Sequence, residues 1–198
     1  MKRMSIVSNF TITVLAAVAL AVGLNSSVHA QKGFGKNNTK KTTINTFPDC
    51  TVVGDNVVAN CGFETGAFAP EWAYAGVFPQ YNFVDNGGLI PGVVHSGTFG
   101  MAMGEIGAVG CISQPVTTVP DQSYTISYWL ANFNAGQPPA NEFQVYWNDA
   151  LLVDLVNLPD SAYAQSAIPD QVGTGADVLT FCARNDPDFI RLDDIVVN

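Results

Sequence analysis

The stretch "SYTISYWLANF" at residues 123–133 carries the clearest structural pattern in the chain. Large apolar or aromatic side chains occupy every second position, namely Tyr124, Ile126, Tyr128 and Leu130. The positions between them hold Thr125, Ser127, Trp129 and Ala131. Because successive side chains of a β-strand point to opposite faces, this period of two predicts a strand with one face in the core.

The same period continues on both sides of this stretch. "TFGMAMG" (98–104) alternates bulky side chains with Gly and Ala, and "EFQVYWN" (142–148) places Phe143, Val145 and Trp147 on one side. Shorter strand-like segments lie at 56–60, 111–116, 149–158, 177–185 and 189–198. Turn formers such as "VPDQ", "NLPDS" and "GTGAD" separate them, and no helical period is present. The chain is therefore expected to be all-β, an antiparallel sandwich or barrel of about eight to ten strands.

The N-terminus is expected to be a targeting region. Residues 1–30 combine a basic start, the short apolar run "TITVLAAVALAVGL" and small residues before Gln31, which is typical of a cleaved secretory signal. An uncleaved anchor is the alternative. Residues 31–49 are rich in Lys, Asn and Thr and are interpreted as a flexible basic leader, which could also tether the protein to an anionic wall. Residues 50–198 have the size of one domain.

Charge and cysteine content restrict the function of residues 50–198. This stretch holds all the acidic residues except Asp49, but only Arg184 and Arg191 of the basic ones. Such an acidic body is not expected to bind nucleic acid, which needs many cations, but it is compatible with calcium. Secretion and an even number of cysteines predict two disulfides. Three pairings are possible, and Cys50–Cys61 with Cys111–Cys182 is favoured.

The order of several short motifs resembles that of a known class of secreted bacterial domain. The motifs are "VVANCGFETGAF" followed by Trp72, "HSGTFGMAMG", "CISQPVTTVPDQSYTISYWLAN", "NEFQVYWNDALL" and "LTFCARNDPDFIRLDDIVV". Together they resemble jelly-roll domains similar to carbohydrate-binding modules of the galactose-binding-like superfamily. Such domains often occur in exported proteins with a C-terminal PEP sorting helix. The printed sequence shows no sorting helix after the last expected strand, so anchoring of that type is not expected.

A structural calcium ion is the first site hypothesis. Glu64 lies early in the domain and Asp193 and Asp194 lie at its end, and domain termini are often neighbours. Three converging carboxylates would repel one another unless a cation neutralised them, and calcium prefers such oxygen ligands. The resemblance implies the same ligands, Glu64 and Asp194 with Asp193. The alternative is that Glu64 accepts backbone N–H bonds or pairs with Arg191.

A carbohydrate site is the second hypothesis. Sugars stack on exposed aromatic rings, and nearby amides and carboxylates bind their hydroxyls. The irregular stretch 69–97 offers Tyr74, Tyr81 and Phe83 for stacking, with Asn82 and Asp85 as a polar rim, whereas Trp72 is expected in the core.

Catalysis is not expected. His95 is the only histidine of the body, and neither Glu71 nor Glu105 lies in a catalytic motif. The sequence thus predicts a secreted or cell-surface protein without a membrane span after signal cleavage. Its expected function is non-catalytic binding of a polysaccharide or other glycan in the extracellular matrix or at a cell surface. The alternative is a structural or adhesive protein that self-associates or binds proteins and binds no sugar.

Overall fold

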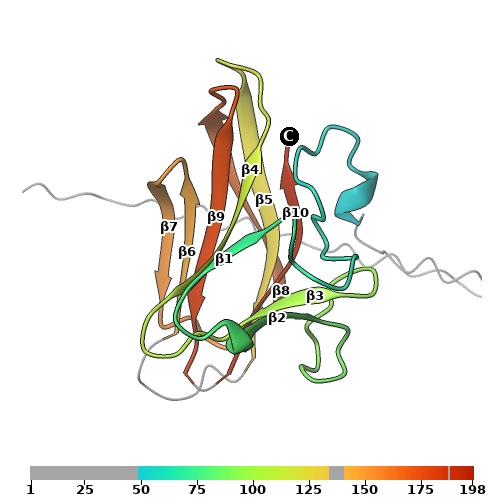
Figure 1. The fold of residues 1–198 in the computed structure, drawn as a ribbon, viewed down its shortest axis with the longest axis vertical. Coiled ribbons are helices and arrows are strands. Elements are labelled where there is room, and N and C mark those ends of the chain that lie inside the picture. Colours follow the sequence, from blue (N-terminus) through green and yellow to red (C-terminus); the bar gives the residue numbers. More distant parts are fainter. Residues whose placement is uncertain (1–48, 134–140, 187) are drawn as a thin grey trace, which may run out of the picture. The chain divides into compact units, whose positions relative to one another are not determined.

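The computed structural model describes residues 49–133, 141–186 and 188–198. Within these ranges the chain forms two five-stranded antiparallel sheets that pack face to face (Figure 1). The all-β sandwich expected from the sequence is therefore confirmed. The signal at 1–30 and nearly all of the leader at 31–49 lie outside the described residues and stay predictions. No helix among the described residues is long and apolar enough to cross a membrane.

The two sheets have the crossing connections of a jelly roll. The first sheet has the order β1 (Ala73–Ala75), β4 (Gly110–Val116), β9 (Asp177–Arg184), β6 (Glu142–Trp147) and β7 (Ala150–Val156). The second has the order β2 (Asn82–Asp85), β3 (Gly100–Met103), β10 (Ile190–Val197), β5 (Ser123–Asn132) and β8 (Ser161–Val172). Two short 3-10 turns, η1 (Cys50–Val52) and η2 (Pro79–Tyr81), lie in the connections. Because most neighbouring strands are not consecutive in sequence, the chain passes repeatedly between the sheets.

The core forms where the inner faces of the two sheets meet. Tyr128 of β5 lies edge-on to Phe181 of β9 with ring centroids 5.3 Å apart, and Phe143 of β6 contacts both rings. All three side chains are almost completely buried, as are Ile126, Val145 and Trp147. Burial of a side chain of this size stabilises the fold by about 1.5–3 kcal/mol. The period of two in 123–133 and 142–148 therefore identified the buried faces correctly.

The segment before β1 lies beside the last strand, as Figure 1 shows for the cyan chain next to β10. Val57 N donates to Val197 O (3.1 Å) and Ile195 N donates to Cys61 O (3.0 Å). The start and the end of the domain are thus neighbours, as expected. The expected strand at 56–60 is wrong, because these residues form loop and turn with only isolated bonds to β10.

Both expected disulfides are present, Cys50–Cys61 and Cys111–Cys182. The first closes the turn that precedes Phe63. The second joins directly opposed residues of β4 and β9, next to the buried Ile112 and Phe181. Cys111 and Cys182 therefore lie on the outer face of their sheet, away from the core.

Candidate functional site

The outer face of the first sheet carries a polar and aromatic group that the sequence hypotheses did not select. In β6, Phe143, Val145 and Trp147 point into the core, so Gln144 and Tyr146 point outward between them, and both are half-buried. The alternation in "EFQVYWN" already contained this signal. The larger apolar side chains lie on the inner face, so the pattern predicts the core face more clearly than the outer one.

The strand register extends this group into two rows across the sheet. Directly opposed residues of an antiparallel pair share one face. Tyr146 is therefore in line with Thr180, Ser113 and Ala73, and Gln144 is in line with Cys182, Cys111 and Ala75. The β1, β4 and β9 side of each row consists of small side chains and a disulfide. In each row, the small side chains or the disulfide on β1, β4 and β9 thus lie beside a larger polar side chain on β6.

Hydrogen bonds hold these polar groups in place. Gln144 Nε2 donates to Glu142 Oε1 (2.6 Å) and to Asp154 Oδ1 of β7 (3.3 Å). The Tyr146 hydroxyl donates to Gln144 Oε1 (2.8 Å). This network, named here the β6 network, therefore consists of Glu142, Gln144, Tyr146 and Asp154. It presents a fixed ring and two carboxylates that can accept hydrogen bonds.

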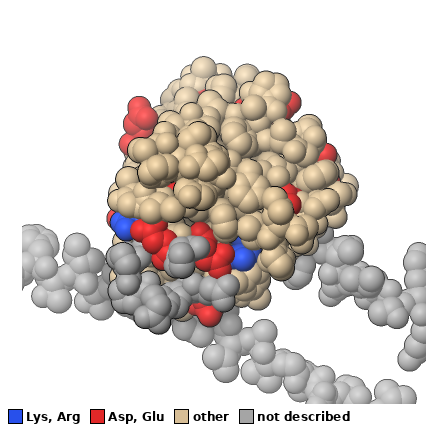
Figure 2. Space-filling view, turned by 60° about the horizontal axis from the view of Figure 1, so that its bottom comes forward, with Lys and Arg blue, Asp and Glu red and all other residues tan. Residues whose placement is uncertain are grey.

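Arg184 borders the β6 network but is already paired. It lies directly opposite Glu142 in the register, yet its Nε and Nη2 bind Asp186 Oδ2 at 3.1 and 2.6 Å. Figure 2 shows acidic side chains gathered at this end of the sandwich between two basic ones, on an otherwise largely uncharged face. Because Arg184 is neutralised by Asp186, it does not make the sheet face attractive to anions.

Two residues of the expected sugar site hold a loop instead. The Tyr74 hydroxyl (2.6 Å) and Asn82 Nδ2 (2.8 Å) both donate to Glu105 Oε2. Glu105 is completely buried, and its Oε1 accepts the backbone N–H groups of Val77 and Phe78, both at 2.7 Å. Burial acts to raise the pKa of Glu105, but these hydrogen bonds together lower it, while burial and the carboxylate raise the pKa of Tyr74. Tyr74 and Asn82 therefore anchor the loop at 76–79.

The expected polar rim is not exposed. Asn82 is only 1% and Asp85 only 8% exposed. Asp85 Oδ2 accepts the N–H groups of Gly87, Leu89 and Ile90 and so closes the following turn. The structure therefore does not place Asn82 and Asp85 on an exposed rim, because Asn82 binds the Glu105 carboxylate and Asp85 satisfies backbone N–H groups that burial makes costly to leave unpaired.

The expected stacking residues also do not share one surface. Tyr74 points from β1 toward the core, whereas Phe83 lies on the outer face of the second sheet, edge-on to Phe189 at 5.5 Å. Tyr81 packs on Phe78 at 6.0 Å. The structure therefore does not bring Tyr74, Tyr81 and Phe83 together into one platform.

The acidic corner is built on a bulge in the middle of β10. The register shifts between Asp193 and Val196, and Asp194 has a φ of 47°. Asp193 Oδ2 accepts the His95 and Ser96 N–H groups at 2.8 and 3.3 Å. Asp194 Oδ1 accepts Cys50 N (3.1 Å) and Ser96 Oγ (3.0 Å), and its Oδ2 lies 2.6 Å from His95 Nδ1. Two adjacent buried carboxylates thus tie together three distant segments.

Electrostatics in this corner disfavour two ionised carboxylates. Burial, and then the neighbouring charge of Asp194, raise the pKa of Asp193 to about 8. The ring of His95 is stacked on Trp129 at 3.9 Å beside Asp194. A hard cation would relieve the repulsion between the two carboxylates, and their oxygen atoms are the donors that calcium prefers.

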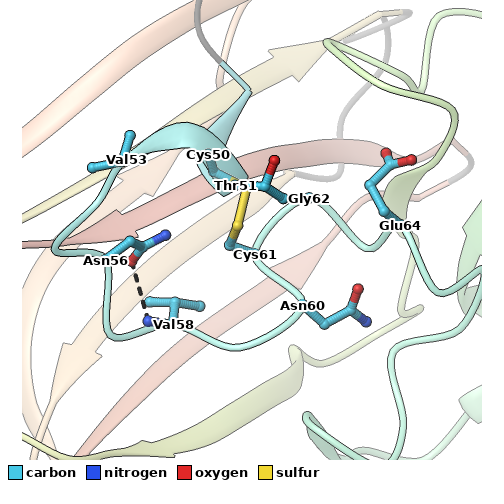
Figure 3. Close-up of a pocket in the computed structure, with 9 residues that line it drawn as sticks. All are labelled: Cys50, Thr51, Val53, Asn56, Val58, Asn60, Cys61, Gly62 and Glu64. Atoms are coloured by element: carbon cyan, nitrogen blue, oxygen red, sulfur yellow. Dashed lines mark hydrogen bonds between the residues drawn. A yellow bond between two sulfur atoms is a disulfide. The ribbon is translucent and has the colours of Figure 1, made fainter.

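Glu64 lies in the same corner but binds backbone amides. Both of its carboxylate oxygens accept Thr98 N at 3.0 Å, and Oε1 also accepts Phe99 N at 3.1 Å. It borders a hollow of about 190 Å³ beside the Cys50–Cys61 disulfide, shown in Figure 3. This is the backbone-bonded alternative considered for Glu64.

The donor set nearest to a cation cage is different from the expected one. Among the described residues, Asp49, Cys50 and Asp194 bring three potential ligand atoms within 4.8 Å of one another, but the Cys50 sulfur is in a disulfide. The carboxylates of Asp49 and Asp194, with Asp193 beside them, fit calcium by chemical type. The calcium site itself stays a prediction.

Comparisons with known proteins support the fold. No family model and no curated protein matches this chain. Among solved structures, TmCBM61 in complex with β-1,4-galactotriose matches with a TM-score of 0.54 at 20% identity, over 72% of this chain and 97% of that one. The xylan-binding domain from CBM 22 matches with a TM-score of 0.51 at 10% identity, over 73% and 95%. The K1 adhesin domain of Lys-gingipain from Porphyromonas gingivalis W83 matches with a TM-score of 0.51 at 12% identity, over 69% of this chain and 95% of that one.

The chain therefore has the jelly-roll fold that carbohydrate-binding modules and cleaved adhesin domains share. A fold of this kind carries different functions on different sites, so function must be argued from the side chains.

Proposed function

We propose that this protein is a secreted, non-catalytic glycan-binding module that binds a neutral polysaccharide on the outer face of the first sheet. The observation that carries the proposal is the β6 network, a hydrogen-bonded aromatic and carboxylate group on a rigid strand. Sites on strands are positioned more precisely than sites on loops. Similarity of the fold to TmCBM61 and to a xylan-binding domain supports the same class of ligand.

Recognition would combine stacking and hydrogen bonds. The ring of Tyr146 offers an apolar surface for the C–H face of a sugar, and Glu142 and Asp154 accept bonds from sugar hydroxyls. The small side chains Ser113, Thr180 and Ala73 leave room above the sheet for further residues of a chain. Because Gln144 is fixed at both ends of its amide, little rotamer entropy would be lost on binding.

The charge of this face selects against acidic glycans. Glu142 and Asp154 lie in the network, and Arg184 is neutralised by Asp186. The negative charge of a uronate or sulfate ester would be repelled by these carboxylates and would lose hydration without gaining a cationic partner. A neutral polymer would avoid both costs.

A structural calcium ion in the acidic corner and an extracellular location belong to the same proposal. Asp193 and Asp194 with Asp49 would hold the ion between the start and end of the domain. Two disulfides fit an oxidising compartment, in line with the signal predicted at residues 1–30.

Self-association is the second candidate function. β7 is an edge strand, and Leu151, Leu155 and Val156 are 50%, 39% and 58% exposed on it. Exposed apolar edge strands are templates for pairing with another chain. The adhesin domains with this fold are compatible with that function.

Glycan binding is tested by titrating the protein with β-1,4-galactan and xylan, and with polygalacturonan as the acidic counterpart. Binding to a neutral polymer should fall at least tenfold in Tyr146→Ala and in Gln144→Ala. Gln171→Ala on β8, at the edge of the other sheet, should bind normally. Binding that survives both β6 substitutions would reject the site. A blank glycan array together with self-association in sedimentation would favour the second function.

A further inference from the structure

A separate hollow lies on the outer face of the second sheet. It has a volume of about 220 Å³. Its lining residues are Val53, Ser127, Trp129, Gln165, Asp194, Val196 and Asn198. The floor is formed by directly opposed outward residues of three strands, since Trp129 pairs with Gln165 and Ser127 with Val196. The segment that contains Val53 borders it on one side.

The aromatic residue in this hollow is held rigidly. Trp129 is stacked on the His95 ring at 3.9 Å with an interplanar angle of 17°, and His95 is itself held by Asp194. Tyr163 packs edge-on to the same His95 ring at 5.1 Å. Trp129 is itself largely buried, with 8% of the residue exposed, so only an edge of its side chain borders the hollow. A fixed aromatic side chain therefore borders the hollow at no further cost in rotamer entropy.

The polar lining points to a neutral ligand. Ser127, Gln165 and Asn198 carry hydroxyl and amide groups that both donate and accept hydrogen bonds. Asp194 is the one charged side chain of the lining, and it is already held by Cys50 N, Ser96 Oγ and His95, so the groups left for a ligand are neutral. An aromatic border, neutral donors and acceptors from rigid strands, and a small volume are together suited to one polyhydroxylated ring.

We propose that this hollow, named here the Trp129 hollow, is a second binding site that accepts a single neutral sugar residue. It is independent of the β6 network, because the two lie on the outer faces of different sheets. A protein with both sites could hold two glycan chains, or two parts of one chain, at once. Linking two weak sites raises the overall affinity without any new contact.

The indole N–H resonances provide the test. The domain has three tryptophans, and Trp72 and Trp147 are core residues that should not respond. Titration with D-galactose, D-xylose and D-glucose should shift the Trp129 Nε1–H signal saturably at millimolar concentration. Gln165→Ala, which removes the amide opposite Trp129, should weaken this response at least fivefold. Ser127→Val, which adds volume on the floor, should weaken it similarly.

Matched controls separate this site from the first. Gln171→Ala is on the same strand as Gln165 but outside the hollow, so the Trp129 response should remain. Tyr146→Ala should weaken polysaccharide binding at the β6 network at least tenfold and leave the Trp129 response unchanged. The proposal fails if no monosaccharide shifts the Trp129 signal, or if the shift is the same in Gln165→Ala and the unaltered protein.

Discussion

Asp177 is a completely buried carboxylate where three loops meet. It accepts bonds from the Thr118 hydroxyl, from Asn148 Nδ2 and from the N–H and hydroxyl of Thr174. Burial acts to raise its pKa, but these bonds outweigh it and lower the pKa to about 2. The side chain therefore fixes the loops at one end of the sandwich in its ionised form.

This arrangement predicts an acid-dependent part of the stability. A pKa that is lower in the folded state stabilises the protein above the unfolded value of about 3.9, and that contribution is lost as pH falls toward 2. It amounts to roughly 2 kcal/mol. Urea unfolding of Asp177→Asn should show a loss of this order at pH 7 and a smaller loss at pH 2.5. Asp55→Asn, in an exposed loop, is the control, and an equal loss at both pH values would contradict the assignment.

A second prediction at the residue scale concerns Gly97, where the backbone requires a glycine. It has a φ of 66°, and an added Cβ would lie 2.3 Å from Glu64 Oε1. Gly87 has a φ of 87° but open space around it. Gly87→Ala should therefore cost about 1–2 kcal/mol from backbone strain alone, and Gly97→Ala roughly 2–4 kcal/mol because Glu64 must also move. Chemical denaturation of both variants measures the difference. Equal losses in the free energy of unfolding would show that Glu64 can move aside without cost.

At the scale of elements, sequence patterns predicted strands well where one face is buried. The alternation in 142–148 identified the core face of β6, whereas Gln144 and Tyr146 on its other side were not among the predicted site residues. β8 was not identified, because "SAYAQSAIPDQV" is an exposed edge strand with few large side chains. The strand expected at 56–60 has β-branched residues but only isolated backbone bonds, so tertiary context overrode its propensity.

The candidate site was harder to predict because it depends on contacts between distant residues. Asn82 and Tyr74 suited a sugar site by type, yet both bind Glu105, which follows 23 and 31 residues later. Nothing local in "AYAGVFPQYNF" indicates that partner. The disulfides could be predicted, because compartment and number limit cysteine to a few pairings.

The disulfide between β4 and β9 gives a prediction for these two elements. It spans 71 residues, against 11 for Cys50–Cys61. In the chain-entropy model the longer loop contributes about 4 kcal/mol and the shorter about 3 kcal/mol. The Cys111→Ala/Cys182→Ala pair should therefore lower the free energy of unfolding more than Cys50→Ala/Cys61→Ala. The reverse order would mean that the corner near Cys50 has a further stabilising role, such as holding a cation.

At the scale of the whole molecule, the acidic corner connects the start of the domain, the loop at 95–98 and the last strand. Asp194 alone bonds Cys50 N, Ser96 Oγ and His95. An ion bound here would stabilise only the folded chain, because these segments are far apart in sequence. The proposed calcium should therefore act on global unfolding and not on one loop.

Calcium added at 100 times its dissociation constant should stabilise the domain by about 2.7 kcal/mol. For a domain of this size that corresponds to a rise in Tm of roughly 5–10 °C. Calorimetry in calcium and in chelator measures it. Asp194→Asn should lose the response to calcium, since it removes a charged ligand while keeping the shape of the side chain. Asp186→Asn, which acts at the salt bridge with Arg184, should keep the full response. A Tm that is the same in calcium and in chelator would exclude the ion and leave His95 and the backbone amides to offset the two buried carboxylates.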